Sequence, residues 1–85
     1  MDAIDVMDRA DSNWYCLRTK RYKENWVAHQ LMGLCDEIYL PLLREQRRIR
    51  RQYTWKIEPL FPGYLFARFI IRERFRAVRY TPGVI

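Results

Sequence analysis

The spacing of hydrophobic and polar residues changes several times along this 85-residue chain, and each change marks an expected element. The segment of residues 14–18 is short and rich in aromatic and apolar side chains, which is typical of a strand, here one that begins at Asn13 or Trp14. From Tyr22 to about Leu34, apolar residues recur every three or four positions, at Val27, Leu31 and Leu34. This second spacing predicts an amphipathic helix of about three turns.

Two further strands are expected on either side of an arginine-rich run. Residues 38–43 are mostly apolar, and Pro41 indicates an edge position or an irregularity there. In residues 53–57, Tyr, Trp and Ile alternate with polar residues, as in a strand. Residues 44–51 hold five arginines and one glutamate, and this charge run predicts a solvated loop or ribbon tip. A long β-hairpin with a basic tip is the simplest structure that joins the two strands.

Residues 58–69 predict a bend followed by a strand, because two prolines and a glycine precede a run that starts near Tyr64. Alternation gives this strand two faces, with Leu65, Ala67 and Phe69 on one and Tyr64, Phe66 and Arg68 on the other. One face must form the core of so small a domain. The other is either covered by the chain's own helices or exposed for a partner, and composition alone favours internal cover.

A short helix is expected from Arg72 to Tyr80, with Phe75 and Val78 on its inner face and a turn at residues 81–83 after it. The expected order is β-α-β-β-β-α, an α+β domain in which an antiparallel β-sheet is flanked by α-helices. Residues 1–12 are interpreted as an acidic, flexible leader and residues 13–85 as one domain.

Charge is distributed unevenly along the chain. The whole sequence has 16 Lys and Arg against 10 Asp and Glu, for a net charge of +6. Residues 13–85 hold 15 of these cations, 12 of them Arg, against 6 acidic residues, for a net charge of +9. A domain this basic is expected to bind an anionic partner.

Several classes of function find no support in the sequence. No apolar run approaches the ~18 residues of a membrane span, and the acidic N-terminus is unlike a secretory signal, so we expect a cytoplasmic protein with no membrane partner. His29 is the only histidine, and no glycine-rich phosphate loop is present. Cys16 and Cys35 are too few for a zinc cluster and are expected to be small buried residues. We therefore expect no enzyme, no metal, no cofactor and no small-molecule substrate.

Residues 58–66, Glu-Pro-Leu-Phe-Pro-Gly-Tyr-Leu-Phe, resemble the signature of the NusG N-terminal domain, which occurs in NusG and its specialised paralogues such as RfaH. Four other segments are similar to the family in the right order: Trp14-Tyr15 with Leu17, Lys20-Arg21, Tyr39-Leu40-Pro41, and Arg76-Ala77-Val78-Arg79 leading into Thr81-Pro82-Gly83-Val84. The resemblance covers residues 13–85. The acidic leader and the arginine-rich hairpin are more similar to a specialised, operon-directed paralogue than to housekeeping NusG.

The resemblance implies a transcription elongation or antitermination module that docks on the clamp helices of the β′ subunit of RNA polymerase. The family's docking surface, carried over by position, would be Phe61, Pro62, Tyr64 and Phe66. The resemblance thus makes the second face of the strand at residues 64–69 a partner site rather than an internally covered one.

The resemblance also implies that the domain lies beside upstream or non-template DNA. The matching candidates for nucleic-acid binding are Lys20, Arg21 and Lys23 at the strand-to-helix junction. The hairpin tip is variable in the family, and its arginines are added as nucleic-acid-binding candidates, with polymerase as the other possible partner: Arg47, Arg48, Arg50 and Arg51. Trp14 and Trp26 could offer stacking surfaces near the junction, but core positions are favoured for both.

The chain departs from the family pattern in two respects. The closing strand and last helix of the N-terminal domain, and the KOW domain that follows them in the family, have no counterpart in the sequence, so a C-terminally truncated domain is expected. The paralogue motif that contacts the β-subunit gate loop is not recognisable near Arg74-Phe75-Arg76. The alternative function is a free-standing basic module that binds single-stranded nucleic acid without polymerase.

Overall fold

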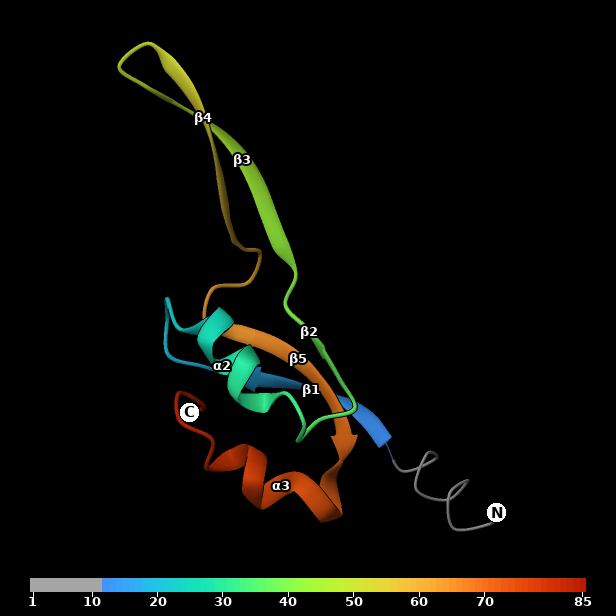
Figure 1. The fold of residues 1–85 in the computed structure, drawn as a ribbon. Helices are drawn as coiled ribbons and strands as arrows, with labels where there is room; N and C mark the ends of the chain where they lie inside the picture. Colours follow the sequence, from blue (N-terminus) through green and yellow to red (C-terminus); the bar gives the residue numbers. More distant parts are fainter. Residues whose placement is uncertain (1–11) are drawn as a thin grey trace.

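The computed structural model describes residues 12–85, so the expected leader lies outside the described residues except for Ser12. Two parts are visible in Figure 1: a body of strands and helices, and a long hairpin that projects from it. The elements in chain order are β1 (Ser12–Arg18), α2 (Glu24–Leu31), β2 (Glu37–Tyr39), β3 (Leu42–Ile49), β4 (Gln52–Pro59), β5 (Tyr64–Ile70) and α3 (Ile71–Arg79).

The body is a three-stranded antiparallel sheet with β5 at its centre, between β1 and β2. β1 pairs with β5 along its whole length, from Ser12 opposite Ile70 to Arg18 opposite Tyr64. α2 and α3 pack against one face of this sheet, and the core lies between the helices and the sheet. Its buried members are Val27 and Leu31 from α2, Leu65, Ala67 and Phe69 from β5, and Val78 from α3. The expected α+β architecture is confirmed.

The strand expected over residues 38–43 is two strands, which makes the order β-α-β-β-β-β-α. β2 ends at Tyr39, and β3 begins at Leu42 in a separate two-stranded sheet. Pro41 lies at the break, where it has no N–H to donate and its carbonyl accepts a hydrogen bond from the Leu60 N–H at 2.8 Å. The chain therefore leaves the edge of the body sheet and enters the hairpin at this proline.

The expected long β-hairpin with a basic tip is confirmed, and residues 44–51 are all exposed. The arginine run, expected to be a solvated loop or ribbon tip, is mostly strand rather than loop. Residues 44–49 belong to β3 and pair with β4, in a register that runs from Leu42 opposite Pro59 to Ile49 opposite Gln52. Only Arg50 and Arg51 form the turn, with φ angles of 51° and 67°. A hairpin accommodates such a run because its backbone groups pair across the strands while the charged side chains stay in water.

Both helices differ in detail from expectation. α2 is shorter than the predicted 22–34, because the backbone becomes extended at Met32 and left-handed at Gly33, where φ is +89°. In α3, Val78 is buried as expected, but Phe75 is 53% exposed.

The core positions favoured for two tryptophans, and the burial expected for the cysteines, are not observed. Trp14 and Trp26 are each about half-exposed. Cys16 is exposed and Cys35 is only partly buried, although this partial burial raises the pKa of the Cys35 thiol. Trp14 and Cys16 alternate along β1 with Tyr15 and Leu17, which pack on the core, so both fall on the face away from the helices.

Gly83 is expected to be indispensable to the packing of α2. Its φ is +91°, and a Cβ atom there would lie 2.4 Å from Cγ2 of Val27. Gly83→Ala should lower the free energy of unfolding by about 2–5 kcal/mol through backbone strain and overpacking. Gly33→Ala is the matched control, because Gly33 has a φ of +89° but no atom within 4 Å of the added Cβ, and it should cost only about 1–2 kcal/mol. Urea denaturation followed by circular dichroism measures both losses, and equal losses would contradict the packing contribution.

Candidate partner-docking face

The loop between β4 and β5 is fastened to the body at Gly63. The Gly63 N–H donates a hydrogen bond of 2.7 Å to Oε2 of Glu24, and the Gly63 carbonyl accepts one of 2.7 Å from the Thr19 N–H. Glu24 and Thr19 are both buried. Glycine suits this point because its φ is +85°. The loop is therefore held between the end of β1 and the first turn of α2, which fixes the start of β5.

The face of the sheet away from α2 and α3 carries a row of aromatic side chains. The register places Cys16 of β1 and Tyr39 of β2 on either side of Phe66 in β5. Directly opposite residues share a face, and residues two apart along a strand share it too, so Trp14 and Tyr64 belong to the same surface. No helix of residues 12–85 packs against this face. Within the described part of the chain, the alternative that its own helices cover this face is therefore wrong.

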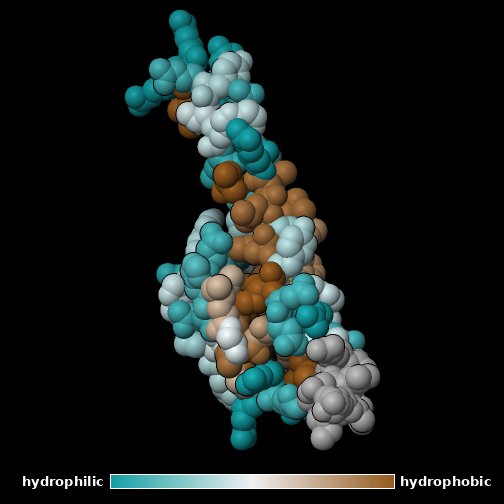
Figure 2. All heavy atoms as spheres, turned by 45° about the vertical axis from the view of Figure 1, so that its right-hand side comes forward, coloured by the Kyte–Doolittle hydropathy of each residue, from teal (hydrophilic) through white to brown (hydrophobic). Residues whose placement is uncertain are grey.

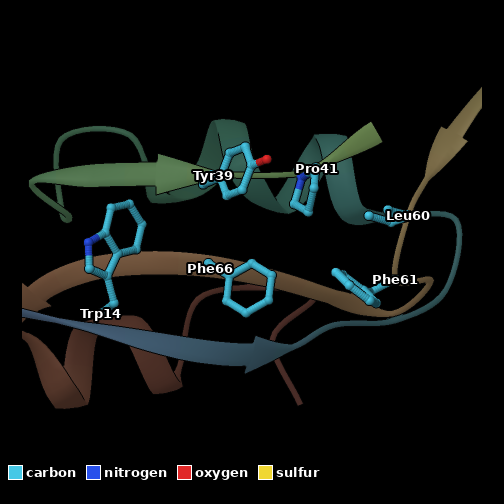
Figure 3. A pocket seen from close by; sticks show the side chains of 6 residues that line it. All are labelled: Trp14, Tyr39, Pro41, Leu60, Phe61 and Phe66. Atoms are coloured by element: carbon cyan, nitrogen blue, oxygen red, sulfur yellow. The ribbon is translucent and has the colours of Figure 1, made fainter. Parts of the chain in front are cut away.

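A groove of about 420 Å³ runs along this face. It is lined by Trp14, Tyr39, Pro41, Leu60, Phe61 and Phe66 (Figure 3). The Phe66 ring lies near its centre, with its centroid 6.4 Å from that of Tyr39 and 6.1 Å from that of Phe61, which meets it edge-on at 83°. None of the lining side chains within residues 12–85 is charged. We call this surface the aromatic groove.

The aromatic groove is part of a larger hydrophobic area. Figure 2 shows hydrophobic atoms gathered over the middle of the molecule, where the body meets the hairpin, with hydrophilic atoms at the far end of the hairpin. Tyr39 and Phe61 are 58% and 48% exposed, so much of the lining is in contact with water. A contiguous exposed apolar surface on a small domain is typical of a partner site.

The charged residues beside the aromatic groove are compensated. Arg68, opposite Trp14, forms an ion pair of 2.9 Å with Glu37 and one of 3.8 Å with Asp36. Its Nη1 also donates a hydrogen bond of 2.8 Å to Oγ of Ser12. The charge of Arg68 is therefore fully compensated, and its two carboxylate partners leave this end of the groove slightly acidic.

The structure brings together two of the four residues expected to dock a partner. Phe61 and Phe66 line the aromatic groove, while Tyr64 lies further along the same face, opposite Arg18. Pro62 instead lines a second cavity of about 390 Å³ on the other side of the loop, with Arg21, Tyr22 and Lys56 among its neighbours.

Four lining residues were not among the predicted site residues: Trp14, Tyr39, Pro41 and Leu60. The signal for Trp14 was its alternation with Tyr15 and Leu17. The signal for Tyr39 and Pro41 was their segment, Tyr39-Leu40-Pro41, already similar to the family.

The basic candidates form two separate clusters. Lys20, Arg21 and Lys23 are exposed in the turn between β1 and α2, and Arg21 lines the second cavity at the base of the hairpin. The arginines at residues 47–51 lie toward the far end of the hairpin, whose eight-residue strands extend for about 26 Å. Arg47 differs from the others because it forms ion pairs of 3.9 Å with Glu45 and 3.8 Å with Glu58.

Residues 12–85 contain no group of three His, Cys, Asp or Glu side chains arranged to hold a metal ion. Within the same residues, no helix has the length and apolar character needed to cross a membrane.

Comparison with known proteins gives a consistent result. The family model described as "Transcription termination factor nusG" matches residues 12–85. Among solved structures, the chain is similar to one described as "Domain interaction in Thermotoga maritima NusG", with a TM-score of 0.65 and 26% sequence identity. The match covers 89% of this chain and 45% of that chain, so the chain spans less than half the length of that protein. No curated protein matches the chain.

Glu24→Ala is expected to release the β4–β5 loop. The substitution leaves the Gly63 N–H without its carboxylate acceptor, which should lower the free energy of unfolding by about 1–3 kcal/mol and speed hydrogen exchange at the Gly63 amide. Glu24→Gln retains an acceptor oxygen and should have a smaller effect. Glu73→Ala, in the exposed first turn of α3, is the control and should leave exchange at Gly63 unchanged. Equal exchange at Gly63 in the Glu24→Ala and Glu73→Ala variants would show that this hydrogen bond does not hold the loop.

Proposed function

The chain belongs to the NusG family, and from this premise we propose that it is a transcription elongation or antitermination module that binds RNA polymerase. The proposed contact is between the aromatic groove and the clamp helices of the β′ subunit. The observation that carries this proposal is the groove itself, an exposed apolar surface with no charged lining on the sheet face that the helices leave uncovered.

The groove suits a helical partner on physical grounds. Helices dock through a few apolar side chains that enter a groove, and Trp, Tyr and Phe rings supply a large contact area at a low cost in side-chain entropy. The ring contacts around Phe66, and the fastening of the adjoining loop at Gly63, hold the lining in place before binding. A preorganised surface loses less entropy on association.

The cluster Lys20, Arg21 and Lys23 is proposed to lie beside upstream or non-template DNA. All three side chains are exposed in one turn. The nearest acidic residue in sequence, Glu24, is buried and accepts a hydrogen bond from Gly63, so its carboxylate points into the body rather than toward this cluster. A concentration of positive charge attracts the phosphate backbone without sequence preference.

The aromatic groove also separates the proposal from its alternative. A free-standing nucleic-acid module that acts through charge has no use for an uncharged groove on the body. If the wild-type chain binds naked nucleic acid tightly at physiological salt but does not bind polymerase, the alternative holds instead.

Truncating two rings of the groove should weaken polymerase binding. We expect Tyr39→Ala with Phe61→Ala to weaken binding to core RNA polymerase and to an isolated β′ clamp-helix fragment by about 30-fold or more, the effect of one hot-spot residue worth about 2 kcal/mol. Both rings are half-exposed, so the fold should persist, which circular dichroism can check. Biolayer interferometry measures the two affinities.

The matched control is Phe75→Ala. Phe75 is a similarly exposed aromatic residue on α3, the layer on the opposite side of the sheet. This variant should bind polymerase as the wild type does. Equal weakening by Phe75→Ala and by the groove variant would argue against the assignment of the groove as the docking surface.

Cys16 should report occupancy of the docking face. Its thiol is exposed on the strand next to Phe66, so a docked partner should cover it, and its rate of alkylation by iodoacetamide should fall in proportion to the fraction of chain bound. Cys35 is the internal control, because it is partly buried and its raised pKa keeps it slow to react in either state. Mass spectrometry reads both sites. Unchanged alkylation of Cys16 at saturating polymerase would place the docking surface elsewhere.

A further inference from the structure

The two faces of the β3–β4 hairpin differ in chemistry. Residues directly opposite in the register project to the same face, so each face can be read from the pairs. One, the ion-paired face, holds the pairs Leu43 with Glu58, Glu45 with Lys56, Arg47 with Thr54, and Ile49 with Gln52. The other, the stacking face, holds the pairs Leu42 with Pro59 at the base of the hairpin, Arg44 with Ile57, Gln46 with Trp55, and Arg48 with Tyr53.

The ion-paired face has no net charge. It holds both acidic residues of the hairpin and two cations, with Lys56 Nζ 2.7 Å from Glu58 and Arg47 within 4 Å of both carboxylates. The hydrogen bond from Lys56 lowers the pKa of the Glu58 carboxyl, so Glu58 stays ionised. Positive charge on this face is therefore cancelled locally, and it offers little to an anionic partner.

The stacking face holds arginines and exposed aromatic rings without an acidic residue. The guanidinium carbon of Arg44 lies 4.0 Å from the ring centroid of Trp55, and that of Arg48 lies 5.9 Å from the ring centroid of Tyr53. An aromatic ring carries no net charge, so a cation held against it has no counter-charge beside it, unlike a cation in an ion pair. Even with these contacts, Trp55 and Tyr53 are 58% and 63% exposed, so ring surface remains available.

We propose that the stacking face, together with the turn at Arg50 and Arg51, binds single-stranded nucleic acid. Bases stack on Trp55 and Tyr53, while phosphates are held by the arginines of this face and of the turn. Cationic side chains interleaved with exposed aromatic rings are the combination that retains single strands, because each base has a π-face and each linkage carries a charge. The assignment differs from the one based on sequence, since it adds Arg44, Tyr53 and Trp55 and leaves out Arg47.

The spacing of the two rings favours a single strand over a duplex. Trp55 and Tyr53 are two residues apart on one strand, so their Cα atoms are separated by about 6.6 Å along it. Bases stacked in a duplex follow one another every ~3.4 Å and keep their faces covered. Only an unstacked, extended strand can present successive bases to rings this far apart.

The turn adds charge at a conformational cost. Arg50 and Arg51 both have positive φ, as a two-residue hairpin turn requires, yet this position is usually filled by Asn-Gly. Two arginines here strain the backbone where Asn-Gly would not. The turn also lies at the end of the hairpin furthest from the body, so a strand bound there leaves the aromatic groove accessible (Figure 1).

The ring contribution is tested with Trp55→Ala in the full chain. Fluorescence anisotropy with a labelled 12-nucleotide oligo-dT, an oligo-rU of equal length and a 12-bp DNA duplex measures affinity. We expect the single strands to bind more tightly than the duplex, and Trp55→Ala to weaken their binding roughly 5- to 150-fold. Trp55→Phe should retain most of the affinity, and the ratio of the DNA and RNA affinities identifies the preferred strand. Duplex binding as tight as single-strand binding, or an unchanged affinity of Trp55→Ala, would overturn the proposal.

The charge contribution is tested with two neighbouring arginines. Arg48→Gln and Arg47→Gln give chains of equal net charge, but only Arg48 lies on the stacking face. Arg48→Gln should reduce the slope of log affinity against log salt by about 0.7, the value for one lost phosphate contact to a single strand, and Arg47→Gln should leave it nearly unchanged. Equal slopes for the two variants would show diffuse attraction and overturn the proposal.

Two further variants keep the outcome interpretable. Arg50→Asn with Arg51→Gly should relieve the backbone strain of the turn and leave the hairpin at least as stable by thermal denaturation. It should also reduce the salt slope by about 1.4, so weaker binding cannot be ascribed to unfolding.

The groove variant Tyr39→Ala with Phe61→Ala should bind the oligonucleotides as the wild type does. Failure of polymerase docking would therefore leave this proposal standing, and loss of oligonucleotide binding would leave docking standing. Protection of Trp55 from oxidation by polymerase free of nucleic acid, without binding to oligonucleotides, would assign the face to protein instead.

Discussion

The hydrogen bonds at Gly63 are the constraint on which the rest of the molecule depends. One residue joins the end of β1, through the Thr19 N–H, to the first turn of α2, through a buried Glu24 carboxylate. Hydrogen bonds to a charged group are worth about 1.5–3 kcal/mol, and here one is shielded from water. The same residue ends the loop that follows the hairpin, and the central strand β5 begins at the next residue, Tyr64. The position of Phe61 on the groove and the base of the hairpin therefore both follow from how Gly63 is held.

The central strand β5 serves the core and the candidate site at once. Leu65, Ala67 and Phe69 bury one face under α2 and α3, while Phe66 on the other face forms the centre of the aromatic groove. Every residue that packs the core on one side therefore positions its neighbour on the other. The sheet is only three strands wide, and no helix of residues 12–85 lies on its second face. Packing of the core against one face of β5 therefore also holds the aromatic groove on its other face in place, although the groove residues do not contribute to the core.

Local patterns predicted the elements better than the site. The alternation in residues 64–69 was correct because one face of a strand must be buried, and this depends only on neighbouring residues. The groove lining was only partly predicted, since Trp14 and Tyr39 reach Phe66 through the pairing of β1 and β2 with β5, which no local pattern specifies. Phe61 and Pro62 are adjacent in sequence but line different cavities, because the backbone of one loop turns between them.

Register explains why the net charge of the domain says little about where an anion would bind. The two-residue turn sets Gln46 opposite Trp55 and Arg48 opposite Tyr53. A slip of one residue would set Glu45 opposite Trp55 and Arg47 opposite Tyr53. The face that carries the two rings would then hold a carboxylate and the arginine that pairs with it. Arg47 and Arg48 are thus indistinguishable by composition and have different surroundings in the fold. The positive charge of the hairpin is divided by its pairing into a neutral face and a cationic, aromatic one, and only the second combines charge with surface on which a base can stack.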